Sequence, residues 1–150
     1  IVVTNCSMKK VVKHHGVPFL EKKQALLTIN ESNKNDIKKI LGQPSTTSKF
    51  DNDVWIYIER KQSQSKLKNL GKMKIYKNDV LVLEIDNYGI LKSKDFYNKD
   101  DMENIKIVET TTDEKYGRNS FIYDFMSSMR QKINDPLGQR AKNRKTINQR

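Results

Sequence analysis

The strongest constraint on the fold comes from two segments, residues 54–58 and 80–85, that are apolar on both faces of a β-strand. Aromatic and β-branched residues dominate both segments, which is typical of strands. Side chains in a strand point alternately to opposite faces. In residues 54–58, Trp55 and Tyr57 lie on one face, and Val54, Ile56 and Ile58 lie on the other. In residues 80–85, Leu81, Leu83 and Ile85 share one face, and Val80, Val82 and Glu84 share the other. Both faces of this sheet therefore need a cover.

Two short helices ahead of the sheet can cover one face. Residues 19–29 have apolar side chains at helical spacing and predict a short amphipathic helix. A second helix over residues 33–41 has Asn33 as its N-cap and Asp36 in its first turn. It ends at Gly42, which suits a left-handed backbone, and two residues later comes a proline. A helix this short is unstable alone, so it must lie on the sheet.

The remaining segments complete an antiparallel sheet. Residues 45–50 are a candidate edge strand, and residues 61–70 read as a polar hairpin loop. A turn at residues 87–89 leads into the last strand. Residues 7–18 are polar and basic, so we expect an exposed, flexible lead-in. The residues expected to be largely buried are Ile37, Ile40, Leu41, Trp55, Leu83 and Ile85.

The C-terminal third predicts a third helix over residues 119–133 and a basic tail. The apolar side chains of this helix form one stripe, made of Ile122, Phe125, Met126, Met129 and Ile133. Its polar side is nearly neutral, unlike that of a helix lying on a membrane. We therefore expect it to pack on protein, either in cis over Val80 and Val82 or on a partner. Residues 139–150 carry five basic residues and no acid, which is typical of a disordered tail.

Catalytic and metal-binding motifs are absent from the sequence. There is no nucleophile triad, paired-cysteine motif, glycine-rich phosphate loop or metalloprotease helix. The adjacent His14 and His15 point apart and have no further ligands at a useful spacing, so we expect no metal. Nothing indicates a cofactor, and we expect no enzyme activity.

The charge favours an anionic partner. The formal net charge is +11, from 29 basic and 18 acidic residues, which suits either nucleic acid or an anionic lipid surface. However, Lys outnumbers Arg by 23 to 6, and phosphate recognition favours the Arg fork. We interpret most of the lysines as ordinary solvated surface.

The single cysteine, Cys6, excludes an internal disulfide. The apolar run before it could be the end of a signal peptide, in which case Cys6 would receive a lipid. The alternative is a free cysteine in a disordered N-terminus. The first six residues alone do not decide between the two.

Taken in order, the motifs of residues 15–95 resemble the BamE (SmpA/OmlA) family. These are Gly16 ahead of the first helix, then Leu-Gly-x-Pro at residues 41–44, then Trp-x-Tyr at residues 55–57. The turn at residues 86–89, with its Gly before the last strand, completes the set. No single motif is specific, but their order and spacing together are.

The resemblance implies an α+β fold, with two short helices packed on a three-stranded antiparallel sheet. It also implies a non-enzymatic accessory lipoprotein of the outer-membrane β-barrel assembly machinery, lipid-anchored at Cys6 and facing the periplasm. Implied partners are BamD, other subunits of that complex and the anionic lipid phosphatidylglycerol, with no nucleic acid. Positions matching the family's partner surface are Phe50 and Arg60, with Gln43 and Ser45 matching in place but not in residue type.

We accordingly divide the chain into four parts. Residues 1–18 are the lipid anchor and lead-in, and residues 19–97 are the BamE-like domain. Residues 98–138 are an extension with the amphipathic helix, and residues 139–150 are the tail. The tail residues that we expect to meet lipid headgroups are Arg140, Lys142, Arg144 and Lys145.

Two other functions remain open at this stage. A basic nucleic-acid-binding module would show salt-dependent binding and an unmodified Cys6. A lactamase-inhibitor-like binding protein shares the helix-plus-sheet shape, and fold alone does not separate it from an envelope scaffold.

Overall fold

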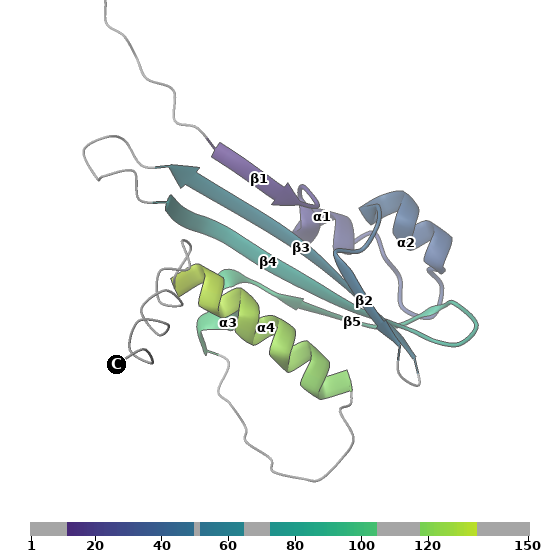
Figure 1. Cartoon of the computed structure of the whole chain (residues 1–150). Coiled ribbons are helices and arrows are strands. Elements are labelled where there is room, and N and C mark those ends of the chain that lie inside the picture. The colour runs from purple at the N-terminus through teal and green to yellow at the C-terminus, as the bar shows by residue number, and fades with distance from the viewer. Residues whose placement is uncertain (1–11, 50–51, 65–72, 105–117, 135–150) are drawn as a thin grey trace, which may run out of the picture.

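A computed structural model describes residues 12–49, 52–64, 73–104 and 118–134 (Figure 1). Its centre is an antiparallel sheet with α1 and α2 on one face and α3 and α4 on the other. The α+β class predicted from the sequence is therefore confirmed. The elements are β1 (Val12–Gly16), α1 (Leu20–Gln24), α2 (Lys34–Leu41), β2 (Thr46–Lys49), β3 (Asp53–Gln64), β4 (Met73–Ile85), β5 (Leu91–Tyr97), α3 (Lys99–Asn104) and α4 (Arg118–Asn134).

The sheet has five strands, whereas the family resemblance implied three. The candidate edge strand at residues 45–50 is confirmed as β2, and β1 was not expected. The order is β1-β3-β4-β5, and β2 also pairs with β3. β1 and β2 lie along the same edge of β3, with β1 opposite residues 59–63 and β2 opposite residues 53–56. β3 is also longer than expected, so residues 61–64 are strand rather than hairpin loop. β4 is continuous through residues 77–79, with a register shift opposite Lys61 and Gln62.

The α1–α2 face of the sheet holds the main core. Leu83, Ile85 and Ile37 are fully buried, and Leu41 and Trp55 nearly so. These five predictions are confirmed. Ile40, also predicted to be buried, is half-buried against the same cluster. The core cluster consists of Val17, Leu20, Leu27, Ile37, Leu41, Trp55, Tyr57, Leu81, Leu83, Ile85 and Leu91.

Helix α2 has the ends that its sequence predicts. The Asn33 side chain accepts hydrogen bonds from the N–H groups of Asn35 and Asp36, and Asp36 accepts one from the Asn33 N–H in return. This reciprocal pairing satisfies N–H groups that have no partner within a helix. Gly42 ends the helix with a φ of 81°, where glycine carries no steric penalty.

The first helix is shorter than predicted, ending at Gln24 rather than near Ile29. The chain then tightens into turns in which Leu26 and Leu27 bond to carbonyls three residues back. The Lys94 ammonium lies against this end of the helix. It donates to the carbonyl oxygens of Gln24 and Leu27 at 3.0 and 2.9 Å, which holds α1 against β5.

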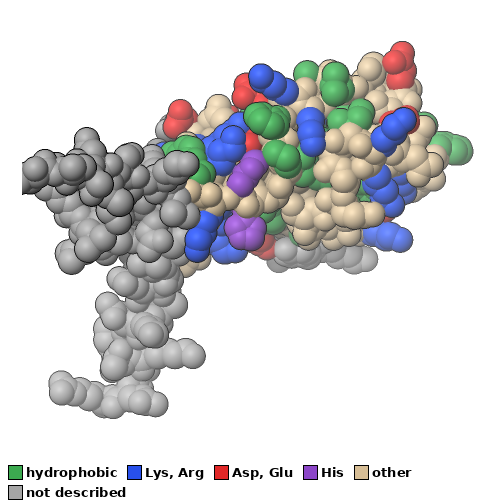
Figure 2. Space-filling model, turned by 90° about the horizontal axis from the view of Figure 1, so that it is seen from above, with side chains coloured by type: hydrophobic (Ala, Val, Ile, Leu, Met, Phe, Trp, Pro, Cys, Tyr) green, Lys and Arg blue, Asp and Glu red, His purple; other side chains and the backbone are tan. Residues whose placement is uncertain are grey.

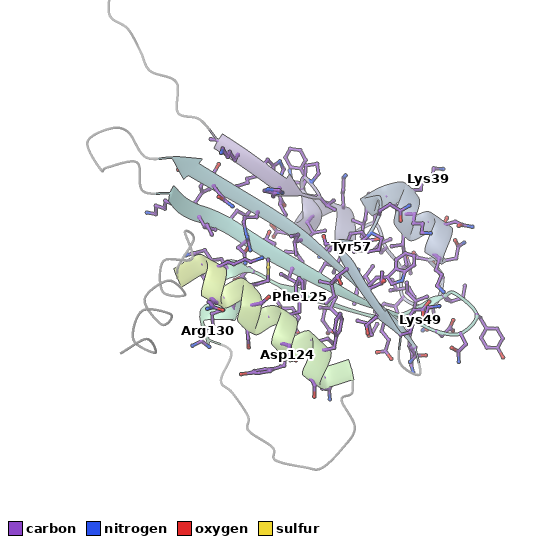
Figure 3. All side chains as sticks on the ribbon, in the orientation of Figure 1. Lys39, Lys49, Tyr57, Asp124, Phe125 and Arg130 are labelled. Carbon is purple, nitrogen blue, oxygen red and sulfur yellow. The ribbon has the colours of Figure 1, made fainter. Side chains whose placement is uncertain are left out.

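The α3–α4 face of the sheet is covered by the chain itself. Met126 and Met129 of α4 and Met102 of α3 are buried against the sheet, with Ile122, Phe125 and Ile133 partly buried beside them. The apolar stripe predicted for residues 119–133 therefore packs in cis, over Val80 and Val82 (Figure 3). The short α3, which the sequence analysis did not predict, adds Met102 to this core.

Candidate interaction surfaces

Three regions bear on the expected function: the α2–β2 loop, the start of α1, and the α3–α4 face of the sheet. Among the described residues no group of three His, Cys, Asp or Glu side chains could hold a metal ion. Within the same residues, no helix is both long enough and apolar enough to cross a membrane.

The α2–β2 loop is held rigidly by the strand beneath it. The Tyr57 hydroxyl donates a hydrogen bond of 3.1 Å to the carbonyl oxygen of Gly42. Burial raises the pKa of Tyr57, so its hydroxyl keeps the proton that it donates. At the other end of the loop, the Ser45 N–H donates to the Ile56 carbonyl at 2.8 Å. Gln43 and Ser45, two of the predicted partner-binding residues, are exposed on this loop.

Lysines flank the same loop. The Lys38 ammonium lies 5.4 Å from the centre of the Trp55 ring, a cation–π distance. Lys39 and Lys49 are exposed on α2 and β2 (Figure 3). On the face that Figure 2 shows, Lys and Arg side chains are spread among hydrophobic ones rather than gathered in one stripe. The described part of the chain thus offers a rigid loop in a basic setting.

The start of α1 is organised by a buried carboxylate, Glu59 of β3, which the sequence analysis missed. It accepts hydrogen bonds from the N–H groups of Phe19 and Leu20, at 3.2 and 2.9 Å. It also pairs with Lys61 and Lys77, at 3.2 and 3.0 Å, and lies 3.3 Å from His14. His14 and His15 both lie on β1, and Figure 2 shows the two histidines at the surface.

Burial alone would raise the pKa of Glu59, but its partners outweigh that effect. Hydrogen bonds from Lys77, the Leu20 N–H, Lys61 and the Phe19 N–H lower the pKa from 4.5 to about 2. Lys77 also pairs with Asp79, at 3.0 Å. Burial raises the pKa of Asp79, while the pKa of Lys77 is raised by its two carboxylate partners despite its own burial.

The chain bends sharply between β1 and α1, and the backbone of Gly16 and Phe19 makes this bend. A Cβ on Gly16 would lie 1.9 Å from the carbonyl oxygen of Ile58, and its φ is 80°, so only glycine fits. Phe19 also has a positive φ, 58°, which is unusual for a bulky residue. The two hydrogen bonds to Glu59 stabilise this bend. The expectation of a flexible lead-in over residues 7–18 is therefore wrong for residues 12–16, which pair with β3, because backbone pairing along an open strand edge needs no apolar pattern.

Arg60, the third predicted partner-binding residue, lies on the α3–α4 face of the sheet. Its Nε donates to the Asn78 side-chain oxygen at 2.9 Å, and its Nη2 contacts the Met129 sulfur at 3.1 Å. Burial lowers the pKa of the Arg60 guanidinium. Arg60 therefore lies against α4. The loop with Gln43 and Ser45 lies apart from it, next to Ile56 nearer the start of β3.

The other predicted site residues lie outside the described residues. They are Cys6, Phe50, Arg140, Lys142, Arg144 and Lys145.

A family model, the outer membrane protein assembly factor BamE domain, matches residues 19–95. That span is just over half of the chain and runs from the first residue before α1 to near the end of β5. The chain belongs to the BamE family. The resemblance stated on the sequence motifs is thereby confirmed, and the role of an outer-membrane protein assembly factor comes with it.

Membership of the BamE family also associates the chain with the outer membrane and its assembly complex. The family is one of accessory factors. No curated protein sequence matches the chain significantly. The BamE domain comprises α1, α2 and β2 to β5, so β1, α3 and α4 lie outside it.

Proposed function

We propose that the chain is a non-enzymatic accessory lipoprotein that acts as a scaffold within the outer-membrane β-barrel assembly complex. It is anchored by a lipid on Cys6 and faces the periplasm. The observation that carries this proposal is the BamE domain match over residues 19–95, which spans both helices and the four strands of the α1–α2 core. A small two-layer domain with a rigid loop suits such a scaffold.

The α2–β2 loop is the open part of the proposed partner surface. Gln43 and Ser45 are exposed there, and Phe50 follows β2 in the sequence. The hydrogen bonds from Tyr57 to Gly42 and from Ser45 to Ile56 fix the loop before a partner arrives. Preorganisation of this kind lowers the entropic cost of association. BamD is the subunit that we propose to bind here.

Anionic phospholipid is the second proposed partner. The tail residues Arg140, Lys142, Arg144 and Lys145 would lie near the membrane if Cys6 is lipidated. A basic residue near an anionic membrane surface contributes about 1 kcal/mol of binding free energy. Phosphatidylglycerol is therefore expected to bind the tail, at low salt above all.

Two experiments test the proposal. Mass spectrometry of the native protein should find an acylated Cys6 as the mature N-terminus, and a native chain that begins upstream with an unmodified cysteine would contradict the anchor. In the second, the native protein is used to capture BamD, with a Gln43→Ala/Ser45→Ala double variant beside it. Thr28→Ala, at an exposed position between α1 and α2, is the matched control.

The outcomes separate the function from the site. Capture of BamD by the native chain supports the assembly role, and its failure contradicts that role. If the native chain captures BamD and the loop variant does so equally well, the assembly role stands and the loop is not the partner surface. We expect weaker capture by the loop variant and an unchanged melting temperature in both variants, because these side chains are exposed.

A further inference from the structure

The α3–α4 face of the sheet belongs to the BamE domain, but its cover does not. Val54, Ile56, Val80 and Val82 lie within residues 19–95, whereas α3 and α4 lie beyond them. The domain therefore presents an apolar sheet face that this chain covers with its own extension. The contacts that hold α4 on this face indicate which other helices the face could bind.

The contact between α4 and the sheet depends on methionines. Met126 and Met129 are 3% exposed, and they meet Met102 of α3 over the strands. Methionine is unbranched and flexible, so it fills irregular gaps and suits surfaces that accept more than one partner. Beside it, Ile122 and Phe125 of the same stripe remain partly exposed. The buried part of this seam between α4 and the sheet is therefore made by methionines, and the other stripe residues are only partly buried.

Arg60 is the polar feature of this seam. A guanidinium has five N–H donors, and within the described residues Arg60 uses them on the Asn78 amide oxygen and the Met129 sulfur. A thioether is a weak acceptor. No carboxylate among the described residues pairs with Arg60. A half-buried cation at an apolar seam is stabilised far better by a carboxylate, which can accept two of its N–H groups at once.

We propose that the α3–α4 face is a docking site for an amphipathic helix of a partner subunit, one that carries an Asp or Glu in its apolar stripe, and that α4 is an exchangeable occupant of this site. The acidic side chain takes the place of Met129 and pairs with Arg60. This inference rests on the proposed function, since it supplies a second surface through which the assembly factor binds its complex.

A partner helix is favoured over α4 of a second copy. The tethered α4 acts at an effective concentration in the millimolar range, so an identical helix from another copy gains nothing by replacing it. Only a helix that binds the face more strongly displaces α4. A carboxylate paired with the Arg60 guanidinium would supply that stronger binding. While α4 occupies the face, the apparent affinity of the partner falls by the fraction of molecules in which the face is open.

Synthetic peptides of residues 118–134 test whether the α3–α4 face prefers a helix with an acidic side chain opposite Arg60. Labelled peptides with Met, Glu or Gln at position 129 are titrated with the full chain and followed by fluorescence anisotropy. We expect the Glu peptide to bind at least about tenfold more tightly than the other two, as for a charge-assisted pair. In the Arg60→Met chain this advantage should vanish. Equal binding of the three peptides, or no binding of any, would overturn the proposal.

Glutamate at position 129 of the full chain, rather than of a peptide, gives an independent test through the melting temperature. Met129→Glu in the full chain places the carboxylate beside Arg60. A carboxylate at a nearly buried methionine normally lowers the melting temperature. Here we expect the melting temperature to hold or rise, and to fall only when Arg60→Met is combined with it. A fall in the Met129→Glu chain that Arg60→Met does not deepen would contradict the role of Arg60.

Exchange itself is tested at an exposed position of α4. Ser127→Gly weakens the helix and Ser127→Ala strengthens it, without touching the seam. If α4 competes with a partner, capture of the assembly complex should rise with Gly and fall with Ala. The opposite order would show that α4 is itself the partner surface, and equal capture would show that it is a fixed part of the core. A change confined to binding of phosphatidylglycerol vesicles would make α4 a membrane element, and each of these three results overturns the proposal.

Discussion

The Tyr57 hydroxyl lies 3.1 Å from the carbonyl oxygen of Gly42 and donates a hydrogen bond to it. Gly42 belongs to the Leu-Gly-x-Pro segment and Tyr57 to the Trp-x-Tyr strand, so one contact joins two of the sequence motifs. Their joint presence in the chain has a structural reason. The strand residue satisfies a carbonyl at the end of α2, where the helix itself offers no N–H.

Replacing this tyrosine tests the contact. Tyr57→Phe keeps the buried ring and removes only the hydroxyl, which leaves the Gly42 carbonyl without its donor. We expect a loss of about 0.5–1.5 kcal/mol in the free energy of unfolding, measured by urea denaturation. Tyr123→Phe on α4, where the side chain is 36% exposed, is the control. Equal stability of the two variants would mean that the hydrogen bond contributes nothing.

The core on the α1–α2 face is tested by Leu83→Ala. Leu83 is fully buried, so its loss leaves a cavity, and we expect a cost of about 2–5 kcal/mol. Leu26→Ala is the matched control, because Leu26 is 67% exposed. Its effect should stay within about 0.5 kcal/mol. Thermal melting followed by circular dichroism checks both, and a Leu83→Ala chain as stable as its control would contradict the placement of this core.

Much of this core could be predicted from the sequence because its signals are local. The alternation separated the side chains of the two sheet faces correctly within residues 54–58 and within residues 80–85. The cap at Asn33 and the glycine at position 42 marked the ends of α2. The stripe from Ile122 to Ile133 predicted a helix within one residue of the observed bounds.

Glu59 and β1 could not be predicted in the same way. Glu59 lies on the face of β3 that carries Trp55 and Tyr57, but its neighbours come from β1, β4 and the start of α1. No local pattern shows that His14, Lys77 and two N–H groups will meet one carboxylate. All residues of β1 are exposed and most are polar, so its pairing with β3 leaves no hydrophobic signal.

The carboxylate of Glu59 predicts a specific dependence of stability on pH. Its pKa is lowered from 4.5 to about 2 in the folded chain. A group with a lowered pKa stabilises the fold above its unfolded pKa, and that stabilisation is lost as the pH falls toward the folded value. We expect the free energy of unfolding to fall between about pH 5 and pH 2, and Glu59→Gln should flatten this fall.

At neutral pH the same variant should be less stable. Removing one partner of a buried ion pair costs about 3–5 kcal/mol, and we expect the lower end because Lys61 and Lys77 each keep 26% of the side chain exposed. Glu31→Gln, an exposed carboxylate, is the control. Urea denaturation at several pH values checks both chains. A Glu59→Gln chain with the native acid profile would show that the ion pairs do not govern it.

The final prediction concerns the division of labour between α4 and the basic tail. Phe125 is partly buried against the α3–α4 face of the sheet, beside Met126 and Met129 (Figure 3). Phe125→Asp places a charge at this apolar seam, so we expect a lower melting temperature. Deleting residues 139–150 should instead leave the melting temperature unchanged and reduce binding to phosphatidylglycerol vesicles at low salt, because it removes five positive charges. Asp124→Asn, at the exposed neighbouring position, controls for a change of charge on the helix. If Phe125→Asp alters only vesicle binding, α4 meets lipid rather than the sheet, and the two roles are reversed.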